Sequence, residues 1–126
     1  MAADKTPAGP IDAAAAAKAA FSAVEGKPFP NDIFTAPQLR WAVIGCGVIA
    51  NQMAISLSLA GRHLHGVANR THDKAVAFAQ RHGVERVYDS VEDLYADPEV
   101  DAVYITTPHN THIRYLRGAL AAGKHV

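Results

Sequence analysis

The ten residues Trp41–Ala50 constrain the fold more than any other part of the chain. A short apolar run there enters a glycine-rich turn, and residues 48–60 continue without proline or glycine, which predicts a helix.

The pattern Gly45-x-Gly47-x-x-Ala50 is typical of a turn that binds a dinucleotide, with alanine in the third position. Gly45 permits the tight turn, Gly47 lacks the Cβ that would block a diphosphate, and Ala50 lets the helix pack closely on the strand. The start of the helix offers unpaired backbone N–H groups and a positive dipole end to phosphates. A turn with a purely structural role is the alternative interpretation.

Strands and helices alternate from Arg40 to the end of the chain. Apolar runs predict strands at 41–45, 64–69, 86–88 and 102–106, and the first step of a fifth at 125–126. Helices are predicted at 48–60, after Thr71 with Gly83 as the stop, from the cap at Ser90 to just before Pro98, and near 111–122. The fold class is therefore α/β, a doubly wound parallel sheet with right-handed crossovers, incomplete at its C-terminal end.

Each predicted helix has an apolar face that we expect to point towards the sheet. Ser90 and Asp93 form a pair typical of a helix N-cap, and Gly83 is a helix stop. The residues expected to face inward are Ile49, Met53, Leu57 and Ala60 in the first helix, Ala75, Phe78, Ala79 and His82 in the second, Val91, Leu94 and Tyr95 in the third, and Ile113, Leu116 and Leu120 in the last.

Residues 1–39 differ in composition from the rest and are expected to form an N-terminal extension, with a single domain at 40–126. An alanine-rich helix is predicted at 13–25, followed by a proline-rich linker at 28–37. The extension is interpreted either as an arm that reaches a partner subunit or as a loosely held segment.

Composition limits the partners and the compartment. The formal net charge is zero, which favours neither nucleic acid nor an anionic membrane as a partner. No apolar run is long enough to span a bilayer, and the N-terminus lacks the features of a signal peptide. Cys46 is the only cysteine, so no internal disulfide is possible and a cytoplasmic location is expected. Its thiol either is reactive beside the helix N-terminus or simply fills space in a crowded turn.

Two histidine pairs, His63-x-His65 and His109-x-x-His112, raise the question of a metal site. A supporting role or solvent exposure is more common for such histidines than ligation, and no acidic or thiol cluster completes the set, so no metal site is expected. His112 is expected to order the preceding loop or to cap the last helix.

Beyond these patterns, the chain from about Arg40 to Val126 resembles the N-terminal half of the Gfo/Idh/MocA oxidoreductases, a family of sugar, inositol and dihydrodiol dehydrogenases. The matching segments are residues 41–50, Ala77-Phe78-Ala79 before His82-Gly83, residues 101–105, Thr107-Pro108-His109-Asn110-Thr111-His112, and residues 119–126. The resemblance implies a nicotinamide-dependent oxidoreductase that acts on a sugar, a polyol or a related hydroxyl or carbonyl compound. The catalytic lysine of the family lies in a Glu-Lys-Pro motif that would follow Val126, so no catalytic residue is expected in this chain, and Lys124 is not that lysine.

By position, three segments are expected to bind the dinucleotide. The glycine turn lines the diphosphate, the end of the second strand meets the adenosine ribose, and the loop after the fourth strand lies near the nicotinamide. The expected cofactor-binding residues are Gly45, Cys46, Gly47, Val48, Ile49, Asn69, Arg70, Lys74, Thr106, Thr107, Pro108, His109, Asn110 and His112. Where an acidic residue would select NAD, this chain has Asn69-Arg70, followed by Lys74, so NADP is expected in preference to NAD.

Two other functions remain open. A module that senses a dinucleotide, or acts as a scaffold, would use the same turn without turnover. A methyltransferase fits residues 107–112 poorly. The full-length protein is expected to be a homo-oligomer, and the isolated chain to be marginally stable or to self-associate, because an edge strand is left unpaired.

Overall fold

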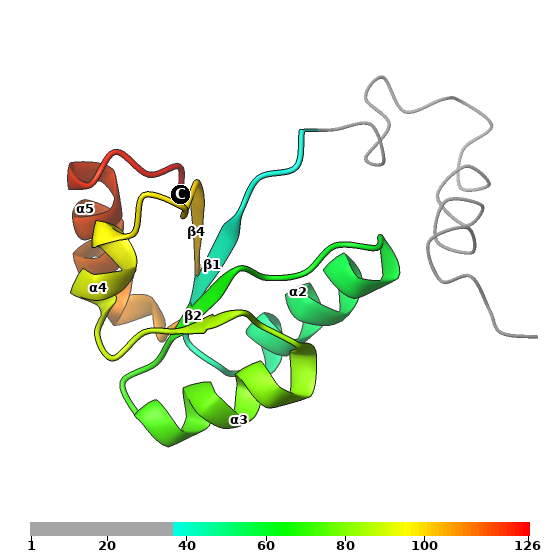
Figure 1. Cartoon of the computed structure of the whole chain (residues 1–126). Coiled ribbons are helices and arrows are strands. Elements are labelled where there is room, and N and C mark those ends of the chain that lie inside the picture. Colours follow the sequence, from blue (N-terminus) through cyan, green and yellow to red (C-terminus); the bar gives the residue numbers. More distant parts are fainter. Residues whose placement is uncertain (1–36) are drawn as a thin grey trace, which may run out of the picture.

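The structure is a computed structural model that describes residues 37–126 (Figure 1). The helix predicted at 13–25 and the linker predicted from residue 28 lie outside the described residues, apart from Pro37, which is exposed. The elements are β1 (Trp41–Ile44), α2 (Val48–Leu59), β2 (Gly66–Ala68), α3 (His72–His82), β3 (Arg86–Val87), α4 (Val91–Ala96), β4 (Ala102–Ile105), the 3-10 turn η1 (His109–Thr111) and α5 (His112–Ala121).

The four strands form one parallel sheet in the order β3-β2-β1-β4. Val43 at the centre of β1 lies opposite Val67 on one side and Tyr104 on the other. After Lys124, His125 forms a parallel bridge with Ala102, as expected for the start of a fifth strand beside β4. The chain moves outward from β1 through β2 to β3 and then returns to the other side of β1. This reversal creates a crevice above the carboxyl ends of β1 and β4, where ligands bind in folds of this type.

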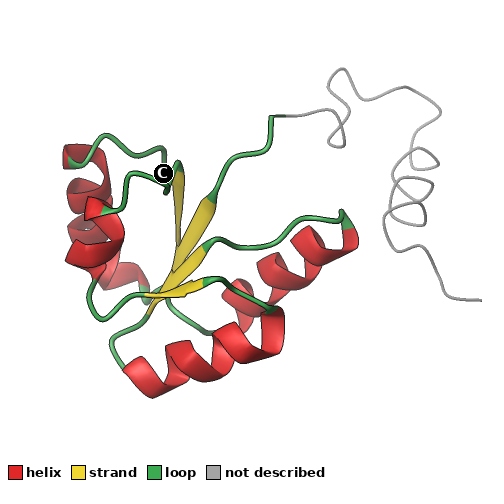
Figure 2. Cartoon of the chain, in the orientation of Figure 1, coloured by secondary structure: helices red, strands yellow, loops and turns green. Residues whose placement is uncertain are grey.

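Helices cover both faces of the sheet: α2 and α3 lie on one face, and α4 and α5 on the other (Figure 2). Each face has its own apolar core, since successive residues of a strand point to opposite sides. Val43 and Val67 pack with Ala50, Ala54 and Phe78 beneath α2 and α3. The second core, beneath α4 and α5, contains Ala42, Ile44, Ala68, Leu94, Val103 and Ala119. The predicted doubly wound α/β fold is therefore confirmed.

Local signals placed the helix ends well. The Ser90 hydroxyl accepts a hydrogen bond from the Asp93 N–H at 3.1 Å, as predicted for an N-cap. Gly83 ends α3 in the left-handed conformation. Among the described residues, no helix has the length and apolar character needed to cross a bilayer.

The inward faces of two helices differ from the prediction. In α2 the fully covered residues are Ala50 and Ala54, with Met53 and Leu57 only partly buried and Ile49 exposed. The small side chains let the helix lie close to the sheet, as predicted for Ala50, and this close approach turns Ile49 away.

The last helix is rotated relative to the prediction. Ile113 and Leu120 are 54% and 58% exposed, and Leu116 is only partly buried, while Ala119 is fully buried and Tyr115 packs beside it. The buried stripe is thus one residue earlier than expected, which corresponds to about 100° of rotation. The physical reason is the contact between α4 and α5, where the Tyr95 ring lies against Gly118 and leaves no room for a larger side chain.

Candidate functional site

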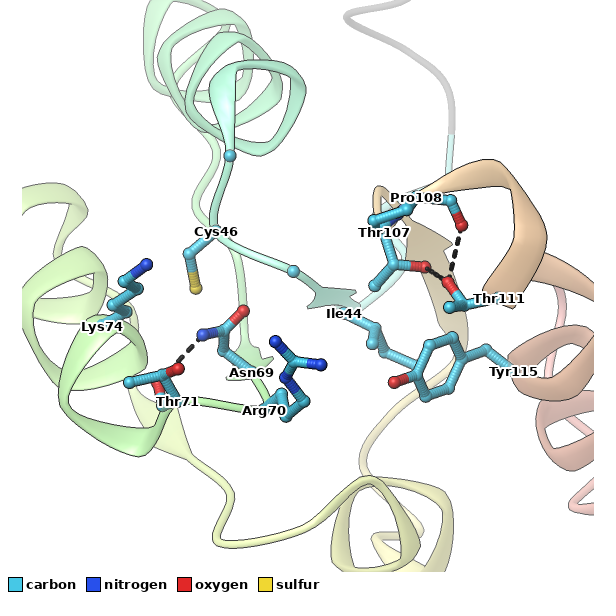
Figure 3. A pocket seen from close by; sticks show the side chains of 12 residues that line it. Ile44, Cys46, Asn69, Arg70, Thr71, Lys74, Thr107, Pro108, Thr111 and Tyr115 are labelled. Carbon is cyan, nitrogen blue, oxygen red and sulfur yellow. Dashed lines mark hydrogen bonds between the residues drawn. The ribbon is translucent and has the colours of Figure 1, made fainter.

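A cavity of about 300 Å³ opens above the carboxyl ends of β1 and β2, beside the loop that follows β4 (Figure 3). Its walls come from the glycine turn, from the segment that joins β2 to α3, and from the segment that joins β4 to α5. The lining residues are Ile44, Gly45, Cys46, Gly47, Asn69, Arg70, Thr71, Lys74, Thr107, Pro108, Thr111 and Tyr115.

The two glycines of the turn are needed for different reasons. Gly45 has a φ of +101°, and a Cβ on it would lie 2.8 Å from Thr106 Oγ1 and 3.2 Å from the Thr106 carbonyl carbon. Gly47 has a φ of −80°, and a Cβ on it would have no protein atom within 4 Å. The protein therefore requires glycine at position 45 for its own conformation and packing. Neither reason applies at position 47, where the absent side chain leaves bare main chain facing the cavity.

The N-terminus of α2 follows directly from this turn. Gly47 is its N-cap residue, no side chain caps it, and no acidic residue lies in its first turn. The first N–H groups of a helix have no partner inside the helix and carry partial positive charge. The end of α2 is thus a place for an anion, and Gly47 leaves the approach open.

Asn51, which the sequence analysis did not select, holds the turn in place. Its Nδ2 donates to the Gly47 carbonyl at 2.8 Å and to the Cys46 carbonyl at 3.3 Å. Its Oδ1 accepts from His82 Nε2 at 2.7 Å and from Arg81 at 3.2 Å. Burial, together with the Arg81 charge, lowers the pKa of His82, which favours the neutral imidazole. The end of α3 is therefore joined through Asn51 to the carbonyl side of the glycine turn.

The wall of the cavity near the end of β2 carries positively charged side chains. The Arg70 side chain projects into the cavity, and Lys74 lies one turn into α3 on the same side (Figure 3). The Asn69 amide donates to the Thr71 carbonyl at 2.9 Å and closes the short connection between strand and helix. No carboxylate is among the residues that line this cavity in the described part of the chain. The wall thus favours an anionic group.

The segment after β4 is ordered by its own hydrogen bonds. Thr106 holds the start of the segment against β1, since its N–H and its hydroxyl both donate to the Ile44 carbonyl, at 2.9 and 3.1 Å. The Thr111 hydroxyl donates to the Pro108 carbonyl at 2.6 Å. His112 Nε2 lies 2.6 Å from the Thr107 carbonyl, and the carbonyl can only accept, so this nitrogen carries the proton. The expectation that His112 orders this loop is consistent with the contact.

The structure brings eight of the fourteen sequence-predicted residues together around the cavity. These are Gly45, Cys46, Gly47, Asn69, Arg70, Lys74, Thr107 and Pro108. The other six lie outside the lining: Val48 and Ile49 are exposed in the first turn of α2, Thr106 is tied to β1, and His109, Asn110 and His112 form η1 and the start of α5.

Four lining residues were missed by the sequence analysis, namely Ile44, Thr71, Thr111 and Tyr115. The first two are immediate neighbours of predicted residues. Thr111 and Tyr115 are four residues apart and so share one face of a helix, a spacing that would have identified Tyr115 once Thr111 was placed at the cavity.

Cys46 is half-buried and packs at the edge of the core beneath α2. Burial raises the pKa of its thiol, and the Lys74 charge offsets only part of that rise. A thiol in this state is a poor nucleophile at neutral pH, so the space-filling interpretation of Cys46 is the better one.

Together, the reversal of strand order, the open glycine turn and the basic wall define a Rossmann-type nucleotide-binding domain. The family model for the Gfo/Idh/MocA oxidoreductases, an NAD-binding Rossmann fold, matches residues 39–126, and the chain belongs to this family. The resemblance noted in the sequence is thereby confirmed.

Individual relatives agree with this assignment. An uncharacterized oxidoreductase of Rhizobium meliloti is 40% identical over 90 residues, which cover 70% of this chain and 27% of that protein. A 1,5-anhydro-D-fructose reductase of Ensifer adhaerens is 34% identical over 88 residues, or 69% of this chain and 26% of that protein. The solved structure of a 3-ketoreductase from Actinomadura kijaniata, in complex with TDP-benzene and NADP, has a TM-score of 0.64 at 35% identity and covers 71% of this chain and 29% of its own. The chain thus spans about a quarter of the length of these relatives.

Proposed function

We propose that this chain is the cofactor-binding domain of an oxidoreductase that uses NAD(P) to oxidise or reduce a sugar, a polyol or a related hydroxyl or carbonyl compound. The observation that carries the proposal is Gly47, where neither the backbone conformation nor the packing requires glycine and where the cavity begins. A diphosphate against the main chain supplies the missing reason for glycine. The substrate class follows from the family and from relatives whose names give an anhydro-sugar and a keto compound.

The described residues divide the binding work among three segments. The turn at 45–47 and the N–H groups of Val48 and Ile49 would hold the diphosphate, and Asn51 keeps that turn in place. The segment 106–110, with His112 behind it, would meet the ribose and nicotinamide at the other end. When bound, the nicotinamide supplies or accepts the hydride. No residue of this chain is assigned as the acid or base, in keeping with the resemblance, which puts the catalytic lysine beyond residue 126.

Dinucleotide titration of a Gly47 variant tests the proposal. Gly47→Ala adds a methyl group where no protein atom lies within 4 Å, so the thermal midpoint should change little. Affinity for NADPH and NADH, measured by calorimetry, should fall at least about tenfold, or 1.4 kcal/mol. The matched control is Ser58→Ala, an exposed position near the other end of α2, which should bind as the unchanged protein does. Equal affinity in the Gly47 variant, or no binding of either coenzyme by the folded unchanged protein, would refute the assignment.

We further propose that the enzyme prefers NADP(H) to NAD(H). Arg70 and Lys74 line the wall at the end of β2, where an adenosine ribose would lie, and a guanidinium forms charge-assisted bonds with a phosphate. A carboxylate at this place would instead accept from ribose hydroxyls and repel the 2′-phosphate.

Arg70→Asp tests this preference, because it exchanges the attraction for a repulsion. The ratio of NADPH to NADH affinity should fall about a hundredfold at low salt, and less at moderate salt because of screening. Arg117→Ser, an exposed site on α5 outside the lining, should leave the ratio unchanged. Tighter binding of NADH by the unchanged protein would contradict the preference while leaving the dinucleotide site itself intact.

The single cysteine fits a reducing compartment, and we propose that the protein acts in the cytoplasm, as a homo-oligomer when full length.

A further inference from the structure

The opposite end of the sheet, at the amino ends of the strands, holds a second group of side chains with metal-ligand chemistry. His65 directly precedes β2, while Asp97 and Glu99 lie in the turn between α4 and β4. One ligand atom from each of the three lies within 4.8 Å of the others. We call these three residues the His65 cluster. His65 is more than thirty positions away from the other two in the sequence, and the sheet brings the three together.

His65 is buried, with only 7% of its side chain exposed, and its two ring nitrogens have different surroundings. Nδ1 lies 3.1 Å from Glu85 Oε2, and because a carboxylate only accepts, Nδ1 carries a proton. Nε2 is the one buried side-chain nitrogen or oxygen without a hydrogen-bond partner in the part of the chain that the structure describes. In the neutral ring the Nε2 lone pair therefore faces Asp97 and Glu99, an arrangement that is unfavourable without a cation between them.

The distances from Nε2 to the two carboxylates are too long for hydrogen bonds but fit the spacing of ligands around a metal ion. Nε2 lies 3.6 Å from Asp97 Oδ2 and 3.7 Å from Glu99 Oε2, which is beyond hydrogen-bond length. A tetrahedral ion with nitrogen and oxygen ligands about 2.1 Å away separates neighbouring ligand atoms by about 3.4 Å. The observed separations are close to that value.

The carboxylates of the cluster are held by hydrogen bonds and lie close to one arginine. Hydrogen bonds from the Tyr88 hydroxyl, at 2.7 Å, and from the Glu99 N–H, at 2.8 Å, lower the pKa of Asp97 and keep it ionised. Arg86 balances part of this charge, with nitrogens 3.4 Å from Asp97 and 3.2 Å from Glu99. About half of the Arg86 side chain is exposed, so it can move towards solvent when a metal ion takes its place.

An open groove gives access to the cluster. It is lined by His65, Glu85 and Glu99 among others, together with the exposed His63. It adjoins two of the three cluster residues, His65 and Glu99, so an ion can approach the cluster from this side.

We propose that His65 Nε2, Asp97 Oδ2 and Glu99 Oε2 bind one divalent transition-metal ion, with zinc as the best match to this nitrogen and oxygen set. Glu85 orients the imidazole through Nδ1, as carboxylates do behind metal-bound histidines. The ion joins the start of β2 to the turn before β4, at the end of the sheet away from the dinucleotide cavity. Because the ion would tie these two segments together, we expect it to stabilise the fold.

Zinc binding to the metal-free protein tests the proposal. Calorimetry should give one ion per chain, and Co²⁺ should give the visible absorption of a tetrahedral site. His65→Gln and Glu99→Gln should each weaken zinc binding at least tenfold and remove the rise in thermal midpoint on adding zinc. The matched controls are His72→Gln, an exposed histidine 3.5 Å from Asp89, and Glu92→Gln, an exposed carboxylate on α4. Both controls should bind zinc as the unchanged protein does.

If His65→Gln lowers stability without metal, Glu99→Gln still decides the question, because about half of that side chain is exposed. Zinc binding that survives in both cluster variants would overturn the proposal, since the ion would then be held by other surface histidines. An absence of zinc binding at neutral pH by the folded unchanged protein would overturn it as well.

Discussion

The two ends of the parallel sheet are built in opposite ways. At the carboxyl ends, the cavity is lined by the bare main chain of the glycine turn and by side chains of mixed size, and its two charged side chains among the described residues, Arg70 and Lys74, are both positive. At the amino ends, the buried His65 and Asp97, the latter bound by the Tyr88 hydroxyl, lie among charges of both signs that pair with one another. Within the described part of the chain, the same strands thus present unpaired positive charge at one end and a cluster of paired charges at the other.

One parallel sheet can therefore keep groups that bind a ligand apart from groups that stabilise the fold. Parallel strands put all their carboxyl ends on one side, where helix N-termini also point, so anions are attracted there. At the amino ends, the chain returns from each helix to the next strand, and charged side chains there can join neighbouring strands. We therefore expect substitutions at the carboxyl ends to change affinity and those at the amino ends to change stability, with Gly45 as the exception.

The largest effect on stability is expected for Gly45→Ala, although this residue lies at the carboxyl end of the sheet. The new methyl group would lie 2.8 Å from Thr106 Oγ1, on a residue with a φ of +101°. Backbone strain and crowding together should lower the free energy of unfolding by about 3 kcal/mol. Urea denaturation of this variant, alongside Gly47→Ala, measures the contrast. Equal stability of the two variants would show that the turn can relax and that Gly45 is not required by the fold.

Tyr88→Phe should be the next largest and tests the amino end. The Tyr88 hydroxyl donates to the buried Asp97 carboxylate at 2.7 Å, and loss of a hydrogen bond to a charged group should cost about 2 kcal/mol of unfolding free energy. Dinucleotide affinity should not change. A fall in affinity with unchanged stability would mean that the two ends are coupled rather than separate.

Asn51→Ala tests whether the glycine turn needs support from a side chain, because Asn51 binds the turn without lining the cavity. Dinucleotide affinity should fall about fivefold to tenfold, or roughly 1 to 1.4 kcal/mol. Gln52→Ala, the exposed neighbour on α2, is the matched control. If both variants bind equally well, the main chain holds the turn without help from Asn51.

The smallest effect at neutral pH is expected for Asp101→Asn. Arg40 donates to this carboxylate through its backbone N–H at 2.7 Å and its guanidinium at 3.1 and 3.2 Å, which holds the pKa of Asp101 at about 2. Because the folded-state pKa is below the usual value near 3.9, this contact stabilises the fold fully above about pH 5 and is lost as the pH falls from about 4 towards 2. The thermal midpoint over this range should fall less steeply in Asp101→Asn than in the unchanged protein. Parallel curves would show that the contact contributes no stability.

Much of the fold was predictable because its signals are local. The turn at 45–47, the stop at Gly83 and the cap at Ser90 each depend on residues within a few positions of one another. The prediction of which α5 residues face inward was wrong, because the answer depends on a contact between residues far apart in the sequence. Which side chains it buries depends on the Tyr95 ring of α4, which packs on Gly118 more than twenty residues later.

The candidate sites divide in the same way. The strand that enters a glycine turn before a helix follows from the amino-acid sequence alone, since backbone conformation and side-chain size act between neighbours. In contrast, Tyr115 faces Arg70 across the cavity, and His65 meets Asp97 and Glu99, only because the folded chain brings distant segments together (Figure 3). Those meetings depend on the order and register of parallel strands, which are set by the packing of the whole sheet between its two layers of helices.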